Sequence, residues 1–297
     1  MKRLIVNADD FGLTTGVNRA IVELHGHGVL TSATLMAKAS ATDDAVQLAI
    51  TNPTLGVGCH VVLVDGVSVL RPRHDLVWLV DPVRTVGTFR PTLGSFLHQL
   101  YKERGSLWPF SNRTLEKEIE AEASAQIRLL QSCGLKLTHI DTHKHTHMFP
   151  RALRPVLRAA RSAGIRAVRN PFEPSWSVHA TPGAPLLRRA QVQLLRTLQS
   201  SFRRIVAEEG FVTTDGAIGV LATGTLDSIA LASLLNAMPD GTWELVTHPG
   251  YNDAALAKVR TRLLASREIE YQALKNASIS QGIELIHFGQ LDMTSHA

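Results

Sequence analysis

Short apolar runs alternate with amphipathic helical patterns along almost the whole chain of 297 residues. Each run has the length of a buried strand, and helical spacing of apolar residues follows it. Strands that alternate with helices pair in parallel, because each helix carries the chain back to the start of the sheet. The strand-like runs span residues 3–8, 30–36, 55–64, 135–140, 165–169, 217–221, 243–247 and 283–288. The helical patterns span residues 17–24, 43–50, 115–130, 153–163, 186–207, 226–238 and 257–274.

Seven or eight strand–helix units follow one another without a linker or a repeat, so we predict one α/β domain over residues 1–297. Its fold class is a single (β/α) barrel of seven or eight parallel strands, complete or distorted. An open doubly wound sheet is disfavoured, because no G-x-G-x-x-G follows the first strand and no P-loop occurs. Two segments stand outside the pattern. They are an aromatic-containing insertion at about 65–113, which we expect to be a lid or substrate-facing loop, and an Arg-rich amphipathic helix at about 186–207.

Composition excludes several classes of protein. Aromatic residues make up 5% of the chain and no long Lys/Arg run occurs, which argues against a nucleic-acid surface. Cys59 and Cys133 are too few for a disulfide framework, and we expect Cys59 to pack in the core. The chain start does not resemble a signal peptide and no apolar run reaches about 18 residues, so we expect a cytoplasmic protein. The helix at 186–207 either packs on the barrel or also contacts an anionic membrane peripherally.

Polar residues gather at the predicted ends of strands, where (β/α) barrels carry their chemistry. These residues are Asp9, Asp10, His60, the segment Asp141-Thr142-His143-Lys144-His145-Thr146-His147, Arg169 and His248. Same-face residues two apart in a strand lie about 6.5–7 Å apart, so only one of the three alternating histidines can join a given metal. One carboxylate and two imidazoles form a sound ligand set for a catalytic divalent cation, with positions left for water and substrate.

The chemistry of these donors limits the choice of metal. Nitrogen and oxygen ligands without a thiolate suit Zn²⁺ best, with Mg²⁺, Mn²⁺, Co²⁺ and Ni²⁺ as alternatives. The adjacent carboxylates of Asp9 and Asp10 repel one another. A cation resolves this repulsion if one carboxylate binds it and the other takes up a proton.

Four segments resemble, in order, the motifs of the YdjC/ChbG family of carbohydrate deacetylases. They are Asn7–Leu13, Gly56–His60, Thr138–Pro150 and Glu244–Tyr251. The resemblance implies a distorted barrel that removes acetyl groups from N-acetylated sugars with one divalent metal. It also implies Asp10, His60 and His143 as metal ligands and Asp9 as the general base. The chain length, the insertion and the Arg-rich helix resemble the hopanoid-biosynthesis branch, HpnK, which implies an N-acetylglucosaminyl hopanoid lipid as substrate.

For this reaction we expect His248 to protonate the leaving amine and Arg169 to orient Asp9 and keep it ionised. His145, His147 and Glu244 are expected to support the structure. Three other functions stay open: a deacetylase of soluble chitooligosaccharides, another barrel metal hydrolase such as a phosphoesterase, and a sugar-binding protein without catalysis. The oligomeric state is also open, a dimer included.

Overall fold

The computed structural model describes residues 1–72, 74–102 and 115–291. Its centre is a curled sheet of seven strands in the order β4-β3-β2-β1-β6-β5, with β7 beside β1. The pairs formed by these strands run parallel. The strands are β1 (Lys2–Phe11), β2 (Ser32–Leu35), β3 (Gly56–Val61), β4 (Ile140–Thr142), β5 (Gly216–Ile218), β6 (Gly241–Thr247) and β7 (Ile283–Leu285).

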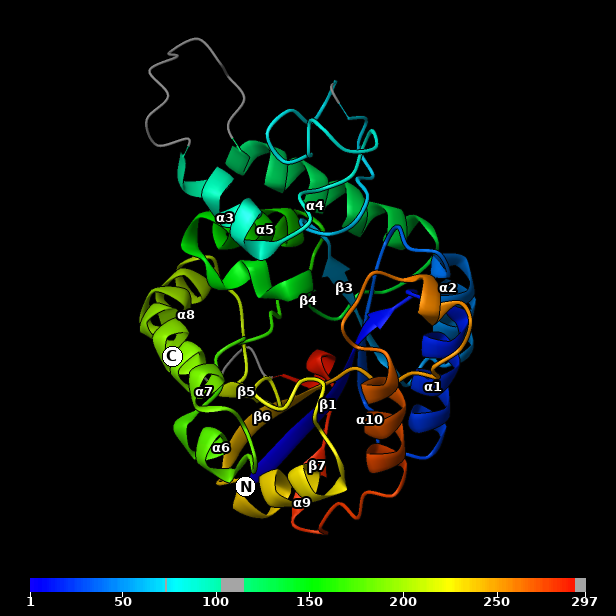
Figure 1. The fold of residues 1–297 in the computed structure, drawn as a ribbon, viewed down its shortest axis with the longest axis vertical. Coiled ribbons are helices and arrows are strands. Elements are labelled where there is room, and N and C mark those ends of the chain that lie inside the picture. The colour runs from blue at the N-terminus through cyan, green and yellow to red at the C-terminus, as the bar shows by residue number, and fades with distance from the viewer. Residues whose placement is uncertain (73, 103–114, 292–297) are drawn as a thin grey trace.

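Helices ring the sheet (Figure 1): α1, α2 and α10 cover one side, α6 to α8 the opposite side, and α4 and α5 lie together at the top of the view. They are α1 (Thr15–Gly26), α2 (Thr42–Thr51), α3 (Leu93–Lys102), α4 (Leu115–Ser132), α5 (Pro150–Ser162), α6 (Ser175–Ala180), α7 (Leu186–Leu195), α8 (Gln199–Glu208), α9 (Ser228–Ala237) and α10 (Ala265–Lys275). Within the described residues, no helix is both long enough and apolar enough to cross a bilayer. The predicted fold class, a distorted (β/α) barrel, is confirmed.

The distortion lies where a regular strand was expected at 165–169. This segment makes only isolated bridges, one to β4 and one to Val212. The chain beyond it still reaches β5, because the N–H of Ala217 donates to the carbonyl oxygen of Phe172 over 3.2 Å. A few separate hydrogen bonds therefore connect the two edges of the curled sheet, in place of a continuous ladder.

Side chains of β1 alternate between two environments, as strand geometry requires. One set packs in the main hydrophobic core between the sheet and the helices, and it comprises Leu4, Val6 and Ala8. The other set faces the interior of the barrel. Ile5 packs there in a small apolar cluster with Phe288, and Asp9 lies further along the strand. The interior is thus apolar near the strand starts and polar near the strand ends.

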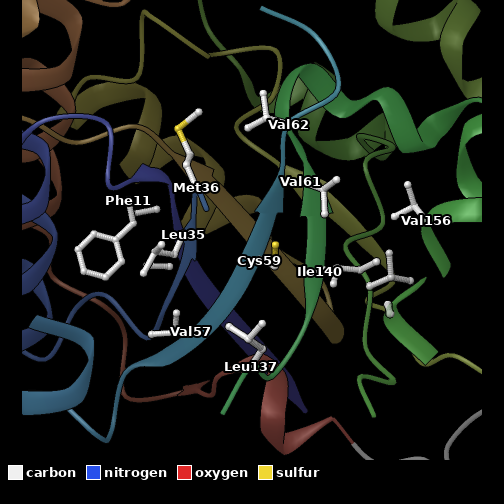
Figure 2. Packing of buried hydrophobic residues seen from close by; sticks show 14 of the residues in the cluster. Phe11, Leu35, Met36, Val57, Cys59, Val61, Val62, Leu137, Ile140 and Val156 are labelled. Carbon is white, nitrogen blue, oxygen red and sulfur yellow. The ribbon is translucent and has the colours of Figure 1, made fainter. Parts of the chain in front are cut away.

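Cys59 packs in the main core, as predicted. Figure 2 shows its side chain among apolar residues of β3 and β4, close to Ile140. Burial raises the pKa of the Cys59 thiol, which keeps it protonated and unreactive. His60 follows it in β3, and its ring lies on the other face of the strand, against Asp141.

Two predicted helices differ from the structure, one in its continuity and one in its extent. The helix at 186–207 is divided into α7 and α8 by a short 3-10 turn at Arg196–Leu198. The helix at 257–274 begins only at Ala265. The preceding chain is a loop with one 3-10 turn, because the carboxylate of Asp253 accepts the N–H groups of Ala255 and Leu256 and turns the backbone.

The insertion is in part a core element, contrary to the lid expectation. Phe89 and the α3 residue Phe96 are buried in the main core. Residues 103–113 of the insertion lie outside the described residues. One face of α4 holds the described part of the insertion. The carboxylate of Glu118 accepts hydrogen bonds of 2.8–3.0 Å from the backbone N–H groups of Val77, Trp78 and Leu79.

Replacing Glu118 by alanine should lower the free energy of unfolding by about 2–3 kcal/mol, because three backbone N–H groups lose a charged acceptor. Urea denaturation of wild type and variant measures this loss. Glu120→Ala, at a partly exposed position of the same helix, is the matched control and should change stability by less than about 0.5 kcal/mol. Equal stabilities of the two variants would show that Glu118 does not anchor the insertion.

Candidate metal centre and active site

A bulge in β1 sets the positions of the two adjacent aspartates. The pairing with β2 shifts its register between Ala8 and Phe11, and Asp10 has a left-handed backbone with φ of 64°. A bulge re-aims side chains that a regular strand would send to opposite faces. Asp9 and Asp10 are therefore both buried on the site side of the strand. Gly12, with φ of 98°, completes the turn toward α1.

Three donor atoms converge at the end of the barrel. His60 Nε2 lies 3.2 Å from His143 Nδ1, and Asp10 Oδ1 lies 3.4 Å from His143 Nδ1 and 3.6 Å from His60 Nε2. Asp10 Oδ1 is buried and has no hydrogen-bond partner within the described part of the chain. An unpartnered buried carboxylate oxygen is costly, and it faces two imidazole nitrogens. This set of donors fits a divalent cation of the kind that the ligand chemistry predicts.

Asp141 orients the ring of His60. Its Oδ1 lies 2.7 Å from His60 Nδ1, which leaves Nε2 directed toward Asp10 and His143. A carboxylate behind a ligating imidazole is a recurring support of metal sites. Burial alone would lower the pKa of His60, but the charge and hydrogen bond of Asp141, together with the charges of Asp9 and Asp10, raise that pKa to about 9. Asp141 received no role from the sequence, although its place two residues before His143 was a usable signal.

Arg169 is fully buried and connects the carboxylates behind the site. Its guanidinium holds Asp9 with two hydrogen bonds, of 2.9 and 2.6 Å, and Nε donates to Glu244 Oε1 over 2.8 Å. It also donates to Asp141. Burial would raise the pKa of Asp9, but the charge and hydrogen bonds of Arg169, together with the imidazoles of His60 and His248, hold that pKa well below its ordinary value. Asp9 is therefore ionised at neutral pH, whereas burial raises the pKa of Glu244 to about 7.

A second group of possible donors, Asp9, His60 and Asp141, lies close by. It fits a cation less well, because Arg169 already occupies the two carboxylates. The balance of buried charges nevertheless favours one cation at the group formed by Asp10, His60 and His143. Five buried carboxyl groups face two buried guanidinium groups: Asp9, Asp10, Asp141, Glu244 and Glu270 against Arg169 and Arg267. A bound divalent cation would offset part of this excess.

Helix α10 contributes two site residues that the sequence did not reveal. Arg267 donates to Asp10 Oδ2 over 2.5 Å, and Glu270 accepts the backbone N–H of His248 over 2.6 Å. No local motif marks them, and Arg267 lies 257 residues from Asp10. His248 lies beside the site, with Nε2 at 3.7 Å from Asp9 Oδ2. Burial lowers the pKa of His248 to about 4, although the Asp9 charge opposes it.

Of the three alternating histidines, only His143 reaches the donor cluster. Strand β4 ends at Thr142, and a 3-10 segment, His143–Met148, follows. His147 supports this segment: its backbone N–H donates to Thr142 Oγ1 over 3.0 Å, and its ring lies 3.2 Å from the carbonyl oxygen of Arg169. His145 is partly buried beside it, and burial lowers the pKa of its ring to about 3.

Comparison with known proteins gives consistent results. The model of a family described as YdjC-like protein matches residues 3–284. A carbohydrate deacetylase from Brevibacillus brevis is 34% identical over 97% of this chain and 99% of its own length. A carbohydrate deacetylase from Thermoanaerobacter pseudethanolicus is 26% identical over 95% of this chain and 94% of its own length.

Two solved structures share the fold. One is an Enterococcus faecalis protein whose name proposes a role in cellobiose-phosphate cleavage, with a TM-score of 0.71, 24% identity and 97% of each chain covered. The other is a lactam utilization protein from Thermus thermophilus, with a TM-score of 0.50, 15% identity and coverage of 96% of this chain and 99% of that chain. At these identities the likeness concerns the fold alone.

Replacing Asp10 by alanine should abolish stoichiometric binding of Zn²⁺, because it removes the unpartnered oxygen and leaves two imidazoles without a carboxylate. Metal content after dialysis, measured by atomic absorption, tests this. Asp43→Ala, at an exposed position of α2, is the matched control and should keep one bound Zn²⁺. Full metal content in the Asp10 variant would contradict the assigned centre.

Proposed function

We propose, because this chain belongs to the YdjC-like protein family, that it is a metal-dependent carbohydrate N-deacetylase. The observation that carries this proposal is the convergence of Asp10, His60 and His143 beside an ionised Asp9. The names of two relatives that span almost the whole chain support the same reaction. The reaction hydrolyses an amide bond between acetate and a sugar amine.

The cation would be held by Asp10, His60 and His143, and Zn²⁺ suits these donors best, with Mg²⁺, Mn²⁺, Co²⁺ and Ni²⁺ as alternatives. Bound there, it supplies Lewis-acid polarisation of the acetyl carbonyl and makes water more acidic. Asp141 keeps the ring of His60 in the required orientation. Arg169 does the same for Asp9, because its two hydrogen bonds fix both carboxylate oxygens.

Proton transfer is assigned to Asp9 and His248. Asp9 accepts a proton from the water that attacks the acetyl carbon. His248 Nε2 lies 3.7 Å from Asp9 Oδ2, so the same proton can pass through one water to the imidazole, which is neutral before the reaction. The imidazolium then donates it to the sugar nitrogen as the C–N bond breaks. The products are acetate and a free amino sugar.

The substrate that we propose is N-acetylglucosamine linked to a hopanoid lipid, as in the HpnK branch. Helix α7 supports an amphiphilic substrate, because none of its ten residues is buried. Leu186, Leu187 and Leu194 are 83%, 72% and 70% exposed. Arg188 donates to the carbonyl oxygens of Val220 and Thr223, in the loop that follows β5. This part of α7 therefore lies at the rim where the strands end.

In the part of the chain that the structure describes, Arg189 of α7 has no acidic partner, so its positive charge is available to an anionic surface. Arg189 donates to three backbone carbonyl oxygens, those of Val178, Thr181 and Ala184. Such bonds hold the side chain without neutralising it. Exposed leucines beside uncompensated arginines are typical of helices that lie at a membrane interface. We propose a cytoplasmic enzyme, and these features of α7 support peripheral contact with the inner face of the membrane.

Wild-type protein reconstituted with Zn²⁺ should release acetate from N-acetylglucosaminyl bacteriohopanetetrol and not from chitobiose. Asp9→Asn should lower kcat by about 10²–10⁴-fold, because it removes the base, while one Zn²⁺ stays bound. An enzyme-coupled acetate assay and the metal content measure both quantities. Release from chitobiose alone would keep the reaction and reject the lipid. Phosphatase turnover with two bound metals would instead favour a phosphoesterase.

Replacing Leu186, Leu187 and Leu194 together by serine should weaken binding to vesicles with anionic lipid by about tenfold, because their apolar surface no longer enters the bilayer. Co-sedimentation with phosphatidylglycerol vesicles measures the binding. Ile50→Ser removes an exposed apolar residue from α2, on the opposite side of the barrel (Figure 1), and should leave binding unchanged. Equal binding of wild type and the triple variant would reject the membrane contact.

A further inference from the structure

The loop that carries His143 has a backbone that its sequence disfavours. Lys144 and the next residue, His145, are left-handed, with φ of 56° and 52°. Residues with a Cβ adopt this conformation rarely, so surrounding contacts must hold it. The base of the loop is tied by the hydrogen bond from His147 N–H to Thr142 Oγ1. That tie leaves the tip of the loop, next to His143, to be fixed by another contact.

Asp65 supplies the contact at the tip. Its Oδ2 lies 2.6 Å from Lys144 Nζ, and its Oδ1 lies 2.6 Å from Arg260 Nη2. Arg260 Nη2 also donates to the carbonyl oxygen of Pro91 over 2.7 Å. One carboxylate thus joins three segments: the start of the insertion after β3, the loop after β4, and the loop after β6.

Asp65 is itself held in place from the backbone side. Its N–H donates to the carbonyl oxygen of Arg90 over 2.8 Å, and its φ is 55°. Among the described residues, the non-glycine residues with positive φ are Asp10, Asp65, Lys144 and His145. Asp65 and Lys144 form this contact. Asp10 is a donor of the metal centre, and His145 follows Lys144 in the chain. In the described residues, the left-handed non-glycine positions therefore lie at the metal centre or in the contact beside it.

We propose that Asp65 is a positioning residue for the metal centre, which acts by holding Lys144 and thereby the backbone that aims His143. This inference rests on the proposed metal centre but not on the reaction. An ordinary surface ion pair would contribute little. The Asp65 side chain, however, is only 17% exposed and accepts from two cations at once. Loosening it removes the side-chain hydrogen bond that holds Lys144 at the tip of this loop.

The test uses the metal alone, on the full chain after removal of bound metal. Zn²⁺ affinity is measured by competition with a chromophoric chelator, and the site is also filled with Co²⁺ to record its visible spectrum. Asp65→Asn and Lys144→Met should each weaken Zn²⁺ binding by about tenfold, the usual cost of losing a support behind a metal ligand. Both should change the Co²⁺ spectrum. The double variant should bind Zn²⁺ no more weakly than the single variant with the lower affinity, because both substitutions break the same interaction.

Three further variants separate positioning from general destabilisation. Lys144→Arg keeps a cation at the tip and should restore most of the affinity. Asp75→Asn breaks a comparable ion pair with Arg71 in the same insertion and should bind Zn²⁺ as wild type does. Arg260→Met removes only the other partner of Asp65 and should also keep the wild-type affinity.

Wild-type affinity and spectrum in Asp65→Asn and Lys144→Met would overturn the proposal, and so would additive losses in the double variant. A loss in Asp75→Asn equal to that in Asp65→Asn would also overturn it, because the effect would then be general. If Asp65→Asn does not fold, the pair Lys144→Met and Lys144→Arg decides the matter alone. None of these measurements requires deacetylase activity, so a failure of the proposed reaction is seen separately.

Discussion

The buried guanidinium of Arg169 is the interaction on which the interior of this barrel depends. It contacts Asp9 of β1, Asp141 of β4 and Glu244 of β6, so it connects the edge strand β4 with the neighbouring strands β1 and β6. An arginine cannot release its proton under ordinary conditions, so its charge is permanent. Without it, three buried carboxylates would lose the positive charge that they share, and bringing the strand ends together would cost free energy.

This arrangement explains why the polar site lies at one end of the interior only. Near the strand starts, the interior is closed by apolar contacts, with His139 stacked on Phe288 at 3.9 Å between ring centroids. Gly58 makes that closure feasible, because a Cβ at this position would lie 2.5 Å from the His139 ring. The apolar end needs no counter-charge. The charged end is built on strands that this packing holds rigid, which suits a site that must keep donor atoms within a few tenths of an ångström.

The sequence predicted the fold well because its signals are local. Alternating strand and helix patterns are visible in short windows. The strand ends gave a wider set of candidates, from which the family resemblance selected Asp10, His60 and His143. Other features depend on partners far along the chain. Arg267 has no motif of its own, and its role follows only from its contact with Asp10. The bulge that brings Asp9 and Asp10 to one side is likewise a matter of pairing with β2. The irregular segment at 165–169 reads as a strand, but its neighbours do not offer it a continuous ladder.

The attachment of the insertion to α4 has a consequence for how such chains can diversify. In the described part of the insertion, Glu118 and Glu122 bind backbone N–H groups and not side chains. Every amino acid except proline carries that donor. These hydrogen bonds therefore depend little on which residues occupy the insertion. Its side chains can change while its backbone stays attached to α4 at the same points. The scaffold keeps the chemistry constant, and the surface beside it is free to adapt to a different acceptor molecule.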